Sequence, residues 1–264
     1  MSAQSLSAQG LSRQREISHV TGDVYRMRDG GHYSLITVTQ KGVVLVDPLN
    51  TRAAQWLKAN LSQITDQPIT HIIYSHSHLD HASGGRVFGE TKTYAHEKAP
   101  KTIDGVTPLV RFENDHTFNV GQKQFELDYL GAGGHGEDSI SVIVRPENVG
   151  FVVDVAAPKR IPSLSEPGQS AIAQLNQVKH FTSKSFTHFA AGHGRIGTHA
   201  DAVEWVTYLE SSIDAVRTGL NQGKSDRQII SDIMQKDADY RTWQQYGPWR
   251  ASSLRIIIKE LKNQ

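Results

Sequence analysis

Cysteine is absent from this chain of 264 residues. Its absence excludes disulfides, thiolate nucleophiles, Fe–S clusters and thiolate zinc sites. The formal charges nearly cancel, with 28 Lys and Arg residues against 27 Asp and Glu residues. We therefore expect neither nucleic acid nor a membrane as a partner, since nothing in the charge balance attracts a polyanion.

Long hydrophobic runs are also absent, because no apolar stretch reaches the ~18 residues that a membrane span requires. Residues 1–16 are polar, rich in Ser and Gln, and lack the apolar centre of a signal peptide. We expect them to form a flexible leader, or to be the remnant of an exported precursor, so the cytoplasm and the periplasm both stay open. Residues 17–264 are expected to form one domain, helical from about residue 200 onward.

Short β-rich segments bounded by turn residues fill much of the chain before residue 200, and helical patterns follow them. The expected strands are His19–Tyr25, Tyr33–Thr39, Val43–Val46, Ile69–Tyr74, Gln124–Leu130, Ser139–Val144, Gly150–Val153 and Ser185–Ala190. The expected helices are Thr51–Ile64, Ser170–His180, a long amphipathic helix after His199, Asp226–Gln235 and Pro248–Lys262. Mixed strands with helices outside them predict a layered α/β architecture.

The chain has 13 histidines, and three of them lie in the segment His76-Ser77-His78-Leu79-Asp80-His81. This segment directly follows an expected buried strand. His76 and His78 are two residues apart, so in extended backbone their side chains project to the same side and can meet at a metal ion. Asp80 and His81 follow as the chain turns, so they can serve a second ion. Metal ions in binuclear sites lie roughly 3.5–4 Å apart.

Two metal ions need more ligands than one segment supplies, and three later residues fit. His135 lies in a glycine-rich turn, Gly131-Ala132-Gly133-Gly134-His135-Gly136, after an expected strand. Asp154 ends an apolar run, where a carboxylate is costly unless it is paired or bound to metal. His193 lies between two glycines after another expected strand. Each of these three positions alone is weak evidence for a metal ligand. The prediction of a binuclear site depends on their joint occurrence after the histidine cluster.

The order and spacing of these residues resemble the signature of the metallo-β-lactamase superfamily, over about residues 17–199. The resemblance implies an α/β fold, an αββα sandwich of two mixed β-sheets flanked by helices, with the metals at one edge. It also implies the ligand partition. His76, His78 and His135 would bind one metal and Asp80, His81 and His193 the other, while Asp154 would be shared. Asp154 and the absence of cysteine are closer to the glyoxalase II, lactonase and phosphodiesterase-like members than to many zinc β-lactamases.

The expected function is a zinc-dependent hydrolase that uses a metal-bridging hydroxide to cleave a small ester, lactone, thioester or β-lactam. Two Zn²⁺ per chain are expected, although a mixed nitrogen and oxygen site also suits Fe or Mn. Asp80, beside the nucleophile, is the expected catalytic acid/base. Two alternatives stay open: a mononuclear iron oxidoreductase similar to persulfide dioxygenases, and a non-catalytic binding member of the fold. The expected partners are a small-molecule substrate and, in a homodimer, a second copy of the chain.

Five further residues are weaker candidates. Asp47 ends an apolar strand and either hydrogen-bonds a ligand imidazole or caps a turn. Lys159 and Arg160 either hold a substrate carboxylate or are simply solvated. His32 is a candidate for a flap over the cleft, and Asp138 for bracing the loop of His135.

Aromatic residues recur in the C-terminal region, where core packing is the first expectation and a role at the cleft mouth or in a dimer contact the second. They are Trp205, Tyr208, Tyr240, Trp243, Tyr246 and Trp249.

Overall fold

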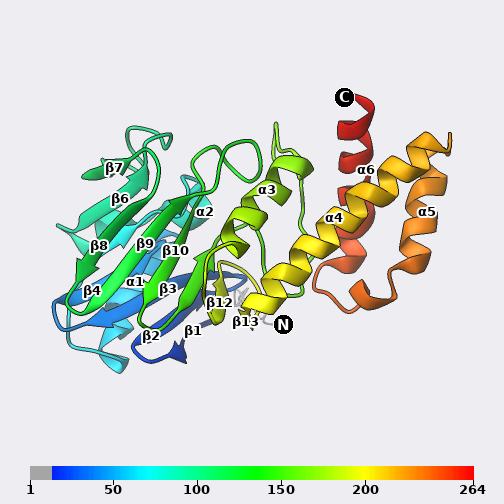
Figure 1. Ribbon diagram of the computed structural model, residues 1–264. Helices are drawn as coiled ribbons and strands as arrows, with labels where there is room; N and C mark the ends of the chain where they lie inside the picture. The colour runs from blue at the N-terminus through cyan, green and yellow to red at the C-terminus, as the bar shows by residue number, and fades with distance from the viewer. Residues whose placement is uncertain (1–13) are drawn as a thin grey trace, which may run out of the picture.

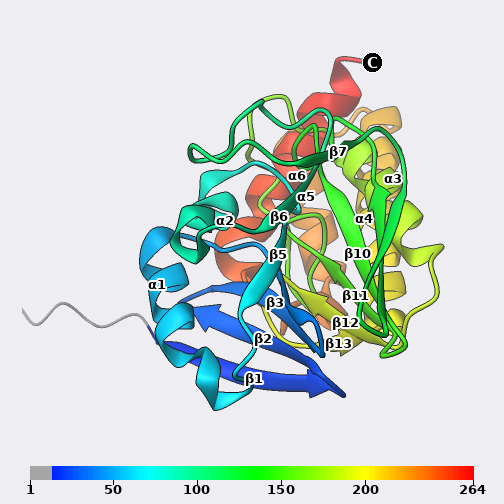
Figure 2. The same cartoon turned by 90° about the vertical axis from the view of Figure 1, so that its left-hand side faces the viewer.

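The computed structural model describes residues 14–264. Two β-sheets pack face to face, and helices cover the outer face of each sheet (Figures 1 and 2). Both sheets contain parallel as well as antiparallel pairs. The expected αββα sandwich of two mixed sheets is therefore confirmed.

The first sheet has seven strands in sequence order, antiparallel from β1 to β4 and parallel from β4 to β7. Its strands are β1 (Arg15–Thr21), β2 (Val24–Asp29), β3 (His32–Thr39), β4 (Gly42–Val46), β5 (Ile69–Ile73), β6 (Lys92–His96) and β7 (Val110–Phe112). All five residues of β4 are buried. Such a continuous apolar run is typical of a strand covered on both faces.

The second sheet has six strands in the order β13-β12-β11-β10-β9-β8. Its strands are β8 (His116–Val120), β9 (Lys123–Tyr129), β10 (Ile140–Arg145), β11 (Val149–Val152), β12 (His188–Ala191) and β13 (Gly197–Thr198). Strands β11 and β12 are parallel, with Val152 opposite Ala191. Their carboxyl ends therefore open at the same edge of the sheet.

Six α-helices complete the described part of the chain: α1 (Thr51–Asn60), α2 (Leu79–Ala82), α3 (Ala171–Thr182), α4 (His199–Asn221), α5 (Asp226–Lys236) and α6 (Tyr246–Lys262). Asn50 caps α1, since its side chain accepts a hydrogen bond from the Ala53 amide. Thr198 and Asp201 form a capping box at the start of α4. No helix in the described residues is long and apolar enough to cross a membrane.

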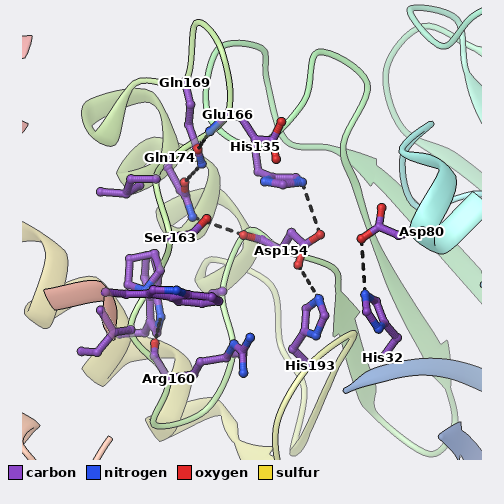
Figure 3. A pocket seen from close by; sticks show the side chains of 17 residues that line it. His32, Asp80, His135, Asp154, Arg160, Ser163, Glu166, Gln169, Gln174 and His193 are labelled. Atoms are coloured by element: carbon purple, nitrogen blue, oxygen red, sulfur yellow. Dashed lines mark hydrogen bonds and ion pairs between the residues drawn. The ribbon is translucent and has the colours of Figure 1, made fainter. Parts of the chain in front are cut away.

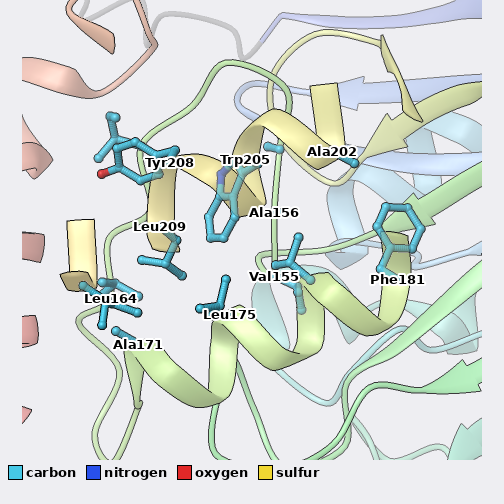
Figure 4. Close-up of a cluster of buried hydrophobic side chains, with 14 of the residues drawn as sticks. Val155, Ala156, Leu164, Ala171, Leu175, Phe181, Ala202, Trp205, Tyr208 and Leu209 are labelled. Atoms are coloured by element: carbon cyan, nitrogen blue, oxygen red, sulfur yellow. The ribbon is translucent and has the colours of Figure 1, made fainter. Parts of the chain in front are cut away.

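Three apolar clusters hold the layers together. One lies between the two sheets and includes Val46 and Phe151. Another packs α1 against the first sheet through residues such as Leu57. The third joins the second sheet to α3, α4 and α6, and in it Leu175 lies beside Trp205 (Figure 4). Burying a side chain of this size contributes roughly 1.5–3 kcal/mol.

Some strands differ from the sequence expectations. The segment His19–Tyr25 is not one strand, because the Gly22-Asp23 turn divides it between β1 and β2. Strands β6, β7, β8 and β13 are not among the expected strands, since such short segments carry little periodicity. Strand β1 begins at Arg15, so the last two residues of the expected leader are in a strand. Residues 1–13 of that leader lie outside the described residues.

Candidate metal centre

All seven residues predicted as metal ligands lie at one edge of the sandwich, in segments that follow strands. The segment from His76 to His81 follows β5 and includes the short helix α2. Asp154 and His193 each come two residues after the paired positions Val152 and Ala191, at the ends of parallel β11 and β12. His135 lies in the loop between β9 and β10.

The first potential metal-binding group consists of His76, His78 and His135, one ligand atom of each lying within 4.8 Å of the others. Nδ1 of His78 and Nε2 of His135 are 3.1 Å apart. Nitrogen atoms bound to one tetrahedral zinc ion lie roughly 3.3 Å apart, given Zn–N distances near 2.0–2.1 Å. The spacing of these imidazoles therefore suits a shared cation.

The second group is built around His81, whose Nε2 lies 3.3 Å from Nε2 of His193. Asp80, His81 and Asp154 have ligand atoms within 4.8 Å of one another. Oδ2 of Asp80 is 3.9 Å from Nε2 of His81, and the Asp80 side chain is 57 % exposed. This half of the centre can hold a second cation and faces open space on the side of Asp80.

Asp154 lies between the two groups. Its Oδ2 is 3.4 Å from Nε2 of His135 and 3.5 Å from Nε2 of His81, and its Oδ1 is 2.8 Å from Nε2 of His193. Although burial opposes ionisation, His81, His193 and His135 hold the pKa of Asp154 well below its usual range. Its φ of 59° lies in the left-handed region, which non-glycine residues seldom adopt outside constrained sites.

The side-chain nitrogen and oxygen atoms of this cluster are chemically suited to bind metal ions. Nε2 of His76 is buried and has no hydrogen-bond partner in the described chain, although it faces the cluster. Burial lowers the pKa of His76, His81 and His135 and favours the neutral form that binds metal. For His193, burial also lowers the pKa, but Asp154 outweighs it and the net shift is upward. A nitrogen and oxygen donor set of this kind is typical of Zn²⁺, Fe and Mn sites.

Asp47 supports the cluster through Ser75 instead of contacting a ligand imidazole itself. Its carboxylate accepts hydrogen bonds from the Ser75 amide at 2.8 Å and from the Ser75 hydroxyl at 2.6 Å. The same hydroxyl lies 3.0 Å from Nδ1 of His76. Burial raises the pKa of Asp47 to about 8, while bound cations would favour its ionised form. With Asp47 ionised, Ser75 accepts from Nδ1 of His76 and leaves Nε2 free for metal.

The loop of His135 is held by α3. Oε1 of Gln177 accepts a hydrogen bond from the His135 amide at 2.9 Å. A Cβ at Gly134 would lie 2.1 Å from that oxygen, so glycine is required for this close approach. Ser139 donates to the His135 carbonyl. Asp138 is buried and hydrogen-bonds Ser77, so it braces the histidine segment after β5.

A cavity of about 340 Å³ opens beside the cluster (Figure 3). The cluster contributes Asp80, Asp154 and three histidines, His32, His135 and His193, to its lining. Apolar residues that include Ile161, Leu164 and Trp249 line it as well. The guanidinium carbon of Arg160 lies 4.8 Å from the centre of the Trp249 ring. No carboxylate in the described residues lies within ion-pair distance of Arg160, which burial leaves with a lowered pKa.

Lys159 and three of the C-terminal tryptophans differ in how they relate to this cavity. Lys159 pairs with Glu204, so its ammonium group is already matched. Trp205 and Trp243 are buried as expected for core aromatics, yet Trp205 and Trp249 also line the cavity. The cavity lining therefore includes aromatic residues that periodicity alone assigns to the core.

His32 is the site residue whose placement the sequence did not reveal. The sequence offers it as a candidate for a flap over the cleft, and the structure places its Nε2 3.3 Å from Oδ2 of Asp80. Its only sequence signal is a position directly after Gly30-Gly31, at the start of an expected strand. That signal does not predict that His32 lies beside loops far away in the chain.

The chain belongs to the metallo-β-lactamase superfamily, whose family model matches residues 27–180. The 2,4-dinitroanisole O-demethylase subunit alpha of Nocardioides sp. (strain JS1661) is 25 % identical over 217 residues, which are 76 % of this chain and 66 % of that protein. The metallo-β-lactamase type 2 of Elizabethkingia meningoseptica is 26 % identical over 174 residues, 59 % of this chain and 66 % of that protein. The chain therefore spans slightly less than two thirds of these curated relatives.

Solved structures agree on the fold. The sec-alkylsulfatase Pisa1 from Pseudomonas sp. superposes with a TM-score of 0.77 at 16 % identity, covering 93 % of this chain and 50 % of that chain. A metallo-β-lactamase from Pontibacter korlensis gives a TM-score of 0.64 at 20 % identity, covering 75 % of this chain and 99 % of that chain. These TM-scores establish a common fold, whereas sequence identities this low leave the substrate open.

Proposed function

We propose that this protein is a hydrolase that depends on two divalent cations, zinc in the first instance, and cleaves a small ester, lactone, thioester or β-lactam. The observation that carries the proposal is the position of Asp154, whose Oδ2 lies 3.4 Å from His135 of one group and 3.5 Å from His81 of the other. A carboxylate between two sets of imidazoles is suited to bridging a pair of cations.

The bound cations would supply a lowered pKa for water and a positive charge that polarises the bond under attack. The chain's own contribution begins with Asp80, whose half-exposed carboxylate borders both the cluster and the cavity. From there Asp80 can orient the attacking water and pass its proton to the leaving group. Neither serine nor cysteine is needed as a nucleophile.

The residues that line the cavity favour an organic substrate with an acidic group. Ile161, Leu164 and Trp249 offer an apolar wall, and Arg160 offers a guanidinium that pairs with no carboxylate of the described chain. A planar guanidinium beside an aromatic ring suits a carboxylate or a sulfate. We therefore place the reacting bond at Asp80 and the acidic group of the substrate at Arg160.

The decisive experiment combines metal analysis with a substrate panel. Purified protein is expected to hold about two zinc ions per chain. It is also expected to hydrolyse members of a substrate panel without consuming molecular oxygen. The panel contains a phenyl ester, a lactone, a thioester and nitrocefin. An alkyl sulfate and an aryl methyl ether are added because of the sulfatase and demethylase named above. One iron per chain with oxygen uptake on a persulfide would contradict the proposal, as would hydrolysis that survives thorough chelation.

A further inference from the structure

His32, the first residue of β3, projects into the second half of the metal centre. Its ring centre lies 4.9 Å from that of His81 and 4.8 Å from that of His193. One nitrogen from each of these three imidazoles lies within 4.8 Å of the others. Figure 3 shows His32 beside His193, with both rings directed toward the carboxylates of Asp80 and Asp154.

We propose that His32 is an eighth metal ligand and binds the second cation together with His81 and His193. This inference rests on the proposed two-metal centre and extends it beyond the seven residues of the sequence motif. Three imidazoles from three separate segments give the second cation the same donor types as His76, His78 and His135 give the first. The second ion then depends less on Asp80, which is left available for acid/base chemistry.

The position of His32 is fixed by its neighbours' backbone atoms. The Tyr33 amide donates to the Gly192 carbonyl at 2.9 Å. In the other direction, Nδ1 of His193 donates to the Gly31 carbonyl at 2.7 Å. These two bonds join the β2–β3 turn to the loop after β12 on both sides of His32. A ligand that is held in place before metal arrives loses little entropy on binding.

The second bond also selects the reactive nitrogen of His193. Because Nδ1–H donates to the Gly31 carbonyl, Nε2 is the nitrogen left to bind a metal, and it faces His81 and Asp154. The turn that positions His32 thus prepares His193 as well. Nearby, the Arg26 guanidinium donates to the carbonyls of Ala191 at 3.3 Å and Gly194 at 3.2 Å, which ties the same loop to β2.

A lesser role for His32 would be to hold Asp80 by a hydrogen bond, since their side chains are 3.3 Å apart. Two variants separate this role from metal binding. His32→Ala removes both the ligand and the hydrogen bond. His32→Gln removes the imidazole but keeps an N–H donor for Asp80. His19→Ala, on the exposed face of β1 in the same sheet, is the matched control.

The test measures bound zinc per chain against increasing concentrations of a competing chelator, together with the absorption spectrum of the cobalt-loaded protein. We expect His32→Ala and His32→Gln to keep the first ion. Both should lose affinity for the second by more than the roughly 10–100-fold that loss of an outer hydrogen-bond partner costs. His19→Ala should match the unmodified protein. Amide exchange in residues 24–39 should slow when the second ion binds, and it should not slow in the His32 variants.

Three outcomes would overturn the inference. If His32→Gln binds the second ion as tightly as the unmodified protein, His32 acts only through Asp80. If both variants keep two ions with unchanged affinity and an unchanged cobalt spectrum, His32 has no role in metal binding. If the unmodified protein never holds a second ion, the inference and the two-metal function fail together. Circular dichroism of the metal-free variants verifies that each is folded.

Discussion

Asp154 and His193 occupy equivalent positions just after two neighbouring parallel strands, and Oδ1 of Asp154 lies 2.8 Å from Nε2 of His193. Each residue comes two positions after a cross-strand pair, Val152 opposite Ala191. The sheet register therefore sets their separation. A shift of one residue in this pairing would turn one of the two side chains away from the cluster, since successive side chains alternate between faces.

Asp80→Asn is expected to separate metal binding from turnover. The amide retains an oxygen ligand but cannot take up and release a proton, so turnover should fall by roughly 10²–10⁴-fold. Bound zinc, measured in the same samples, should change little. Asp214→Asn, an exposed change on α4, is the control and should leave both quantities unchanged. Turnover of Asp80→Asn at the level of the unmodified enzyme would exclude Asp80 from the mechanism.

Arg160→Met is expected to weaken the binding of acidic substrates specifically. Methionine keeps an extended apolar side chain beside Trp249 while the charge is lost. A hydrogen bond to a charged group contributes roughly 1.5–3 kcal/mol, which corresponds to about 10–100-fold in kcat/KM. Neutral ester analogues should be affected far less. Arg52→Met, exposed on α1, serves as control, and equal losses on charged and neutral substrates would contradict the assignment.

Gly134→Ala is expected to reduce metal affinity without any change to a ligand. The new Cβ would lie 2.1 Å from Oε1 of Gln177 and 2.9 Å from the Gln174 backbone, so the loop of His135 must shift. Zinc competition titrations should report weaker binding of the first ion. Gly247→Ala, which meets nothing within 4 Å in α6, should be neutral or slightly stabilising. Unchanged zinc affinity in Gly134→Ala would show that the loop adapts freely.

The metal-free protein is expected to lose stability in mild acid. Burial lowers the pKa of His76, His81 and His135 from 6.5, to about 4 for His81. Between these values the unfolded chain binds protons that the folded chain excludes, so the free energy of unfolding falls as pH decreases. Asp47, with a pKa raised to about 8, acts in the opposite direction. Burial also raises the pKa of Asp128 and Asp138, and it lowers the pKa of His71 and His116. Five imidazoles therefore oppose three carboxyls, and we expect the histidines to dominate below pH 6.5.

Above pH 6.5 the sign reverses, because the folded-state pKa values of Asp47 and His193 are raised and their stabilising contribution is lost as pH rises. Maximum stability of the metal-free protein should therefore lie near pH 6.5. Urea unfolding in the presence of a chelator, from pH 4.5 to 8.5, measures the profile. His81→Asn should flatten its acidic side and Asp47→Asn its alkaline side. A profile that stays flat in both directions would contradict these assignments.

Much of the candidate centre could be predicted because its ligands follow strand ends. The segment from His76 to His81 contains four candidate ligands within six residues, and covalent spacing alone keeps them together. Asp154 and His193 follow apolar runs that end in the same way, so their place at a sheet edge was expected. The fold class followed from the alternation of strand and helix patterns, although these patterns did not predict β6, β7, β8 and β13.

His32 and Arg160 could not be placed in this way. His32 reaches the centre because the β2–β3 turn of the first sheet is hydrogen-bonded to the loop after β12 of the second sheet. Arg160 lines the cavity, and its backbone carbonyl accepts a hydrogen bond from Trp205 of α4 at 3.0 Å. Both contacts join residues far apart in the chain, and local periodicity carries no information about them.

The sequence by itself determined which side chains can bind metal and that each follows a strand, because these properties depend on residue type and short covalent spacing. Only the tertiary structure decided that the ligand atoms converge around Asp154, that His32 lies beside them, and that Arg160 lies against Trp249 with no carboxylate of residues 14–264 at ion-pair distance. Those relationships depend on how two sheets pack face to face, and that packing is set by side chains from every layer at once.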